Sequence, residues 1–127
     1  MKGSGWPLRV MALAFFAGCG GSDVAPSQPP AATPAATITI TASGVSPRNI
    51  TVSPGSQVQF VNNDSREHQM YSDPHPEHTD CPPFDQVGSL RPGDSRTTGN
   101  LNVTRTCNFH DHLRFEDAAL RGSVIIR

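Results

Sequence analysis

Histidine and cysteine, side chains that bind copper and zinc well, are concentrated in one third of this chain. All five histidines lie between positions 68 and 112 of the 127 residues, together with two of the three cysteines. These residues are His68, His75, His78, Cys81, Cys107, His110 and His112. Imidazole nitrogen and thiolate sulfur suit both metals. The clustering alone is equally compatible with a metal site and with a group of solvated polar loops.

Two short segments narrow this prediction to a family. In residues 61–68, VNNDSREH, an alternating stretch runs into an Asn-rich turn, and a histidine begins the next stretch. In residues 106–112, TCNFHDH, a cysteine and two histidines stand close together, and the alternating run GSVII follows at 122–126. Taken in this order, the segments resemble the cupredoxins, the plastocyanin and azurin family of small copper proteins.

The resemblance implies a mononuclear copper site, a role in electron transfer and strong absorption at about 600 nm. It assigns His68 as the first imidazole and Cys107 as the thiolate. The second imidazole is either His110, at a plastocyanin-like spacing from the cysteine, or His112, at an azurin-like spacing. The histidine that does not bind copper would then orient its neighbour.

The expected axial ligand departs from the family pattern. Family members often carry Met-Lys-Gly-Thr before the last strand, whereas this chain has Leu120 at the start of the corresponding run LRGS. Leucine cannot coordinate a metal, so the site has three ligands unless Met70, Glu116 or a further histidine supplies a fourth. Met70 stands two residues after His68 and is expected on the same strand face, in the core.

A disulfide is the alternative use of the two later cysteines. An exported domain meets an oxidising compartment, which favours pairing Cys81 with Cys107. Such a bond would remove Cys107 from the ligand set and leave a site of imidazole nitrogens alone. The protein would then be a copper chaperone, store or sensor instead of an electron carrier. His75 and His78, in the acidic and Pro-rich run DPHPEH, are accessory ligands, pH-sensitive surface groups or solvated loop residues, and the solvated role is favoured.

Short strands must position these side chains. Alternation of β-branched with polar residues marks half-buried strands. The expected strands are residues 37–41, 50–52, 57–61, 95–101, 103–109 and 123–126. No stretch has a sustained helical period, and residues 70–87 carry too many prolines for a central strand. The pattern predicts an all-β protein, a small antiparallel Greek-key β-sandwich of the cupredoxin type.

The first 36 residues are typical of an export and anchoring region. A charged start, a short apolar run and Phe-Ala-Gly-Cys predict a signal peptide over 1–18 and resemble the lipobox of bacterial lipoproteins. The resemblance implies a lipid anchor at Cys19 on the periplasmic face of a bacterial membrane, and Gly20 is compatible with the outer membrane. Residues 19–36 are expected to be a Pro/Ala-rich linker, and 37–127 the folded domain.

Charge and composition exclude several functions. Ten basic and eleven acidic residues give a net charge of -1, too little positive charge for a nucleic-acid partner. The sequence contains no acid–base constellation beyond the histidines and no second domain to form a substrate cleft, so no enzymatic activity is expected. We expect a monomer that meets a redox partner protein and, through Cys19, a membrane.

Overall fold

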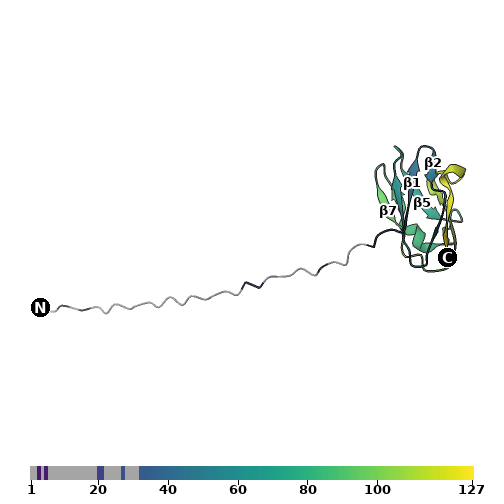
Figure 1. Cartoon of the computed structure of the whole chain (residues 1–127). Helices are drawn as coiled ribbons and strands as arrows, with labels where there is room; N and C mark the ends of the chain where they lie inside the picture. Colours follow the sequence, from purple (N-terminus) through teal and green to yellow (C-terminus); the bar gives the residue numbers. More distant parts are fainter. Residues whose placement is uncertain (1–2, 4, 6–19, 22–26, 28–31) are drawn as a thin grey trace. The chain divides into compact units, whose positions relative to one another are not determined.

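The computed structural model describes residues 3, 5, 20–21, 27 and 32–127. Cys19 and most of the expected signal peptide lie outside these residues. The chain divides into two units, Met1–Pro30 and Ala31–Arg127, and the second contains the folded domain with its strands (Figure 1). In the part of the chain that is described, no helix is long and apolar enough to cross a membrane.

Four strands form the first sheet of this domain, in the order β2-β1-β4-β7. They are β1 (Ala36–Thr41), β2 (Gly44–Ser46), β4 (Val58–Asn62) and β7 (Ser95–Thr97). β1 carries the expected Thr-Ile alternation, and its Ile38 and Ile40 are fully buried because they face the second sheet. β1 pairs antiparallel with β2 and parallel with β4.

Five strands form the second sheet, in the order β3-β9-β8-β5-β6. They are β3 (Asn49–Val52), β5 (His68–Ser72), β6 (Gly88–Leu90), β8 (Arg105–Asp111) and β9 (Gly122–Ile126). β8 is central and antiparallel to both neighbours, with His110 opposite Tyr71. Its register is regular, so its side chains alternate between the sandwich interior and the outer face of the sheet. This alternation decides where its cysteine and its histidine point.

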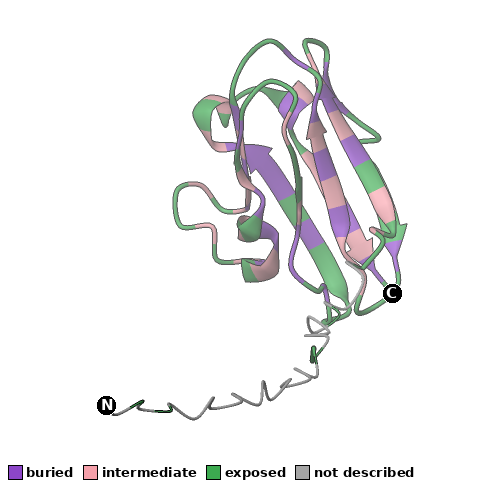
Figure 2. Cartoon of the chain, turned by 90° about the vertical axis from the view of Figure 1, so that its left-hand side faces the viewer, coloured by how far each residue is buried: buried purple, intermediate pink, exposed green. Residues whose placement is uncertain are grey.

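Short 3-10 helices lie in the connections: η1 (Pro82–Gln86), η2 (His112–Arg114) and η3 (Ala118–Leu120). Between the sheets, Phe60 makes edge-to-face contacts with Phe84 at 5.2 Å and with Phe109 at 5.3 Å. Figure 2 shows the resulting bands of buried residues along the strands. A disulfide joins Cys81, directly before η1, to Cys107 of β8, and both residues belong to the buried core.

The predicted all-β sandwich is confirmed, with two refinements. Both sheets are mixed, because β1 with β4 and β3 with β9 pair in parallel. The segment 70–87, which was not expected to form a central strand, begins within β5, a strand that pairs with both β8 and β6, and its Phe84 is a fully buried core residue.

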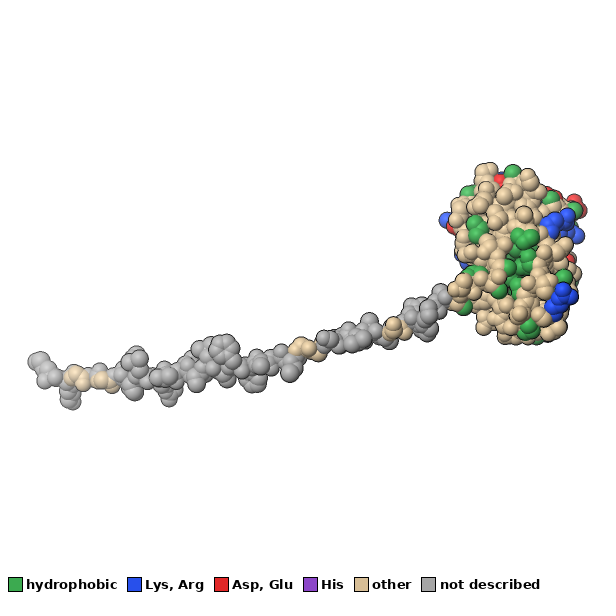
Figure 3. Space-filling model, in the orientation of Figure 1, with side chains coloured by type: hydrophobic (Ala, Val, Ile, Leu, Met, Phe, Trp, Pro, Cys, Tyr) green, Lys and Arg blue, Asp and Glu red, His purple; other side chains and the backbone are tan. Residues whose placement is uncertain are grey.

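Charged side chains are sparse on the face of the domain seen in Figure 3. Arginines lie along one edge of that face, and its centre is uncharged with scattered hydrophobic groups. The view thus shows no broad cationic surface on this side, in keeping with the net charge of -1.

Candidate metal centre

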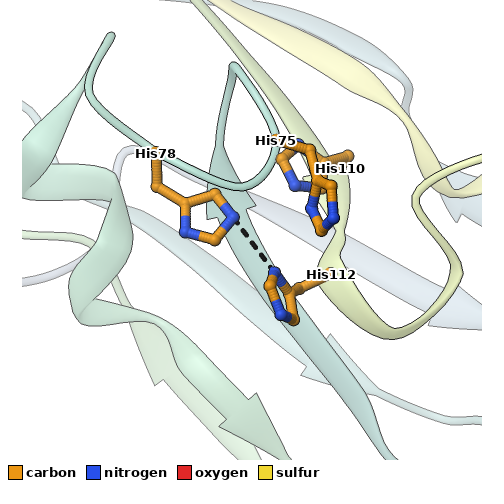
Figure 4. A group of neighbouring side chains, drawn as sticks. All are labelled: His75, His78, His110 and His112. Carbon is orange, nitrogen blue, oxygen red and sulfur yellow. Dashed lines mark hydrogen bonds between the residues drawn. The ribbon is translucent and has the colours of Figure 1, made fainter.

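Four of the five histidines converge at one place. His75 and His78 come from the loop between β5 and η1, His110 from β8 and His112 from the first position of η2. One ring nitrogen from each lies within 4.8 Å of the corresponding atoms of the other three. Figure 4 shows the imidazoles of the loop facing those of β8 and η2. The domain therefore brings together two pairs of ligands from two separate segments.

The loop that carries His75 and His78 is held by backbone hydrogen bonds. At its base, the Asp80 N–H donates to the Asp73 carbonyl oxygen at 2.9 Å, and within it the His78 N–H donates to the Pro74 carbonyl oxygen at 2.7 Å. The Ser72 hydroxyl donates to the His78 carbonyl oxygen at 3.1 Å. His78 has a φ of 55°, a left-handed conformation that is uncommon outside glycine and that such contacts must hold in place.

The strand side of the centre follows from the pleat of β8. Cys107 and Phe109 point into the core. Because side chains alternate along a strand, His110 points to the outer face, where the loop of His75 and His78 covers it and leaves it 1% exposed. At the end of the strand, the Asp111 carboxylate accepts the Leu113 N–H at 3.1 Å and caps η2. His112, which follows this cap as the first residue of η2, lies beside His110.

Aromatic rings cover two of the imidazoles. Tyr71 of β5 stacks on His78 with ring centroids 4.5 Å apart. Phe115 stacks on His75 at 4.0 Å, with the two planes 6° from parallel. These contacts limit the rotamers of the loop histidines and partly exclude water from the centre.

The hydrogen bonds leave ring nitrogens of the centre without partners. His110 Nδ1 lies 2.6 Å from an Asp73 carboxylate oxygen, and His112 Nδ1 lies 3.1 Å from His78 Nε2. His75 Nδ1 and His110 Nε2, by contrast, are buried with no hydrogen-bond partner among the described residues. Buried polar atoms are nearly always paired, so these two nitrogens are the atoms of the cluster best placed to bind a metal.

Electrostatics keep the loop histidines in the form that binds metals. Burial lowers the pKa of His75, and the neighbouring His112 and His110 act in the same direction. Burial likewise lowers the pKa of His78, together with His110 and His112. Both rings therefore favour the neutral state, in which imidazole has a lone pair to donate.

The donor set fits copper or zinc bound through nitrogen. In a tetrahedral site with metal–nitrogen bonds of about 2.0 Å, ligand nitrogens lie about 3.3 Å apart. The observed limit of 4.8 Å is larger than this separation, so the imidazoles would move closer together by up to about 1.5 Å on binding a metal. Four imidazoles also suit the tetragonal geometry of Cu(II).

The structure corrects the expectation that Cys107 is a thiolate ligand. Cys107 is bonded to Cys81 and is fully buried, so it has no free thiolate. It also faces the sandwich interior, whereas His110, three residues later, faces outward. A copper site that combines these two side chains does not fit this structure.

His68 is the second correction, because it lies apart from the other four histidines. Both of its ring nitrogens are engaged by carboxylates: Nδ1 is 2.8 Å from Asp111 and Nε2 is 2.9 Å from Asp64. Arg114 contacts the same Asp111 carboxylate at 3.3 Å. The inward-facing end of β5 therefore carries a buried ion-pair network where the sequence suggested a ligand.

The remaining ligand candidates are resolved by burial and by the cluster itself. Leu120 and Met70 are both core residues, as expected for Met70. His110 and His112 are both in the centre, so the choice between them disappears. For His75 and His78 the favoured role of solvated loop residues is corrected, because both belong to the four-histidine cluster, as the alternative of accessory ligands expects. Their two-residue spacing was the available signal, but nothing in the sequence shows that this loop folds over β8.

Comparison with known proteins supports the fold. No family model and no curated protein matches the sequence. Among solved structures, the chain is similar to a purple cupredoxin from Nitrosopumilus maritimus, with a TM-score of 0.56 and 19% identity over 72% of this chain and 99% of that one. It is similar to plastocyanin from Dryopteris crassirhizoma (TM-score 0.55, 17%, covering 72% and 99%). It is also similar to a mutant amicyanin (0.57, 14%, 77% and 87%). The domain therefore has a cupredoxin-like fold.

Proposed function

We propose that this protein binds one copper ion through the imidazoles of His75, His78, His110 and His112. The observation that carries the proposal is the pair of buried, unpartnered nitrogens, His75 Nδ1 and His110 Nε2, inside this group. A bound cation would supply the partner that both atoms lack. Imidazole sites bind Cu(II) more tightly than the other common divalent first-row metals, and one of the similar structures is an amicyanin with Cu(I).

The proposed role is that of a copper carrier, store or sensor. A nitrogen-only ligand set favours Cu(II) and gives no thiolate to support both oxidation states in one geometry. The Cys81–Cys107 disulfide supports this role over that of a thiolate-type electron carrier. We propose no enzymatic activity and a monomeric state.

Electron transfer through the same centre is the second candidate, and one contact favours it. Tyr71 stacks on His78 at 4.5 Å and is only partly buried, so an aromatic ring lies between the centre and the surface. Voltammetry of the copper-loaded protein tests this role. Rapid, reversible one-electron cycling is the expected result for a carrier of electrons, and a slow or irreversible response excludes it.

The proposed location is the periplasmic face of a bacterial membrane, with a lipid anchor at Cys19. The support is the run Phe-Ala-Gly-Cys after a short apolar stretch, followed by a Pro/Ala-rich linker. Mass spectrometry of the mature N-terminus tests it: a diacylated Cys19 is expected, and an unmodified or uncleaved terminus contradicts it. The Cys19→Ser variant should leave the membrane fraction.

Titration of the metal-free protein with Cu(II) against a competing chelator tests the binding function. One copper per chain is expected, with loss of tight binding when His110 is replaced by Ala. Asn108→Ala is the matched control, because Asn108 is an exposed residue of the same strand on the same face. A His110→Ala variant that is folded and binds copper like the wild type contradicts the proposal.

A further inference from the structure

Asp73 connects the metal-binding loop to the strand that carries His110. Its carboxylate oxygen lies 2.6 Å from His110 Nδ1, and the carboxylate is 35% exposed while the imidazole is 1% exposed. The contact thus joins a solvent-reaching acid to a buried ring. No other carboxylate of the described residues is within hydrogen-bonding distance of the four clustered histidines.

The backbone of Asp73 is fixed independently of its side chain. Its N–H donates to the Asn108 carbonyl oxygen at 3.0 Å, which extends the pairing of β5 with β8. Its carbonyl oxygen accepts the Asp80 N–H at 2.9 Å, which closes the base of the loop. A change of side chain at position 73 therefore preserves the hydrogen bonds that hold the loop.

The contact determines which nitrogen of His110 is available. A carboxylate can only accept a hydrogen bond, so Nδ1 must carry the hydrogen and donate it to Asp73. The lone pair of the neutral ring then lies on Nε2, the atom that is buried without a partner. A hydrogen on Nε2 would instead leave a buried donor unsatisfied and the Asp73 carboxylate without its donor, so this tautomer is disfavoured.

We propose that Asp73 is a positioning residue that holds His110 in the tautomer and orientation in which Nε2 binds the metal. The proposal rests on the four-histidine copper centre and names the residue that prepares it. Carboxylate partners of ligand imidazoles raise ligand basicity and orient the ring, and their loss typically weakens metal binding by about 10–100-fold. Asp73 does not itself bind the metal.

The test compares Asp73→Ala, Asp73→Asn and Asp73→Glu in the full chain. Asp73→Ala should weaken Cu(II) binding by about 10–100-fold. Asp73→Asn should weaken it less, because the amide oxygen still accepts a hydrogen bond. Asp73→Glu, which keeps a carboxylate, should bind Cu(II) more tightly than Asp73→Ala. The matched control is Asp80→Asn, which removes the same charge from the same loop. In the described residues no imidazole donates a hydrogen bond to the Asp80 carboxylate.

A readout on the metal-free protein separates positioning from general loss of structure. Long-range 1H–15N correlation spectra report the tautomer of each histidine. We expect His110 to carry its hydrogen on Nδ1 in the wild type and in Asp80→Asn, and on Nε2 to a substantial extent in Asp73→Ala. An unchanged melting temperature for Asp73→Ala shows that the domain is intact.

The outcomes distinguish this proposal from the copper centre itself. Wild-type affinity and an unchanged tautomer in Asp73→Ala overturn the positioning role, even if His110→Ala abolishes tight binding. Wild-type affinity in His110→Ala overturns the copper centre. A tautomer change in Asp73→Ala without any change in affinity shows that Asp73 orients the ring but does not prepare a metal ligand, and this also contradicts the proposal.

Discussion

Cys107 and His110 stand three residues apart on β8 and face opposite sides of its sheet. Cys107 points inward and is bonded to Cys81, whereas His110 points outward, under the loop that carries His75 and His78. Because strand side chains alternate, an odd separation in a regular strand places two side chains on opposite faces. The proposed metal centre is therefore on the outer face of the sandwich, whereas the disulfide lies in the interior of the sandwich.

Removal of the disulfide should lower stability and leave copper binding in place. In the Cys81→Ala, Cys107→Ala double variant, loss of a cross-link between residues 26 positions apart lowers the free energy of unfolding by up to about 3.5 kcal/mol. Urea unfolding measures this change, and copper titration should still give one ion per chain. A folded double variant that has lost copper binding contradicts a nitrogen-only centre.

The loop histidines should matter as much as the strand histidines. His75→Ala and His78→Ala each remove a ligand, so each should weaken copper binding by more than the 10–100-fold typical of a partner outside the ligand set. Competition titrations against a chelator measure these changes, with Asn108→Ala as the control. If either loop variant binds copper as tightly as the wild type, that histidine is not a ligand but a solvated loop residue.

The hydrogen bond between Asp64 and His68 predicts a pH dependence of stability. The His68 hydrogen bond is the largest cause that lowers the pKa of Asp64 from 3.8 to about 2. A carboxyl group with a depressed pKa stabilises the fold fully above its unfolded value of 3.8 and loses this contribution as pH falls towards 2.

The Asp64→Asn variant checks this dependence. It should be less stable than the wild type near neutral pH, and the difference in unfolding free energy should shrink as the pH falls through this window. Chemical denaturation at a series of pH values measures it. A difference that stays constant down to the lower pKa would show that the charge of Asp64 is not the source of the stabilisation.

Copper binding should quench the fluorescence of Tyr71. The chain has one tyrosine and one tryptophan, and Trp6 lies in the expected signal peptide, so Tyr71 is the only phenol or indole fluorophore of the mature protein. Because its ring stacks on His78 at 4.5 Å, paramagnetic Cu(II) in the centre should quench the emission strongly at one equivalent. Zn(II), which is diamagnetic, is the control and should quench far less. Unchanged emission with bound Cu(II) would place the metal elsewhere.

Gly122, at the start of β9, should tolerate no side chain. A Cβ atom there would collide with the Arg48 carbonyl oxygen and with the Phe109 ring. Overpacking of this kind costs about 1–3 kcal/mol or more, so Gly122→Ala should lower the melting temperature clearly. Gly21→Ala should leave it unchanged, because no described residue lies within 4 Å of the added methyl group. Equal melting temperatures for the two variants would contradict the close approach of these segments.

Much of the fold could be predicted from local patterns. The Thr-Ile alternation of β1 and the Gly-Ser-Val-Ile-Ile run of β9 each bury one face, so the strands are visible in the sequence. The parallel pairing of β1 with β4 depends on contacts between distant segments and has no such local signal. Phe84 was not predicted as a core residue because the surrounding prolines argued against a strand there and no alternation marks its position.

The site was predicted only in part, for a related reason. The family resemblance implies that His68 and Cys107 are ligands. Both residues are instead engaged by tertiary contacts: Cys107 is bonded to Cys81, and His68 lies between the carboxylates of Asp64 and Asp111. Such contacts have no local signal in the sequence. The same resemblance implies that His110 or His112 is a ligand, and both belong to the four-histidine cluster. The contribution of the loop histidines depends on how that loop folds back over β8.

The most direct test of the copper centre is X-ray absorption spectroscopy of the full chain loaded with one equivalent of Cu(II). The account predicts a first shell of nitrogen scatterers with the outer-shell features of imidazole, no sulfur scatterer, and no intense absorption band at about 600 nm. His110→Ala should lose imidazole scattering. A sulfur atom in the first shell of the wild-type protein, lost in Cys107→Ser, would contradict the account and restore Cys107 as a copper ligand.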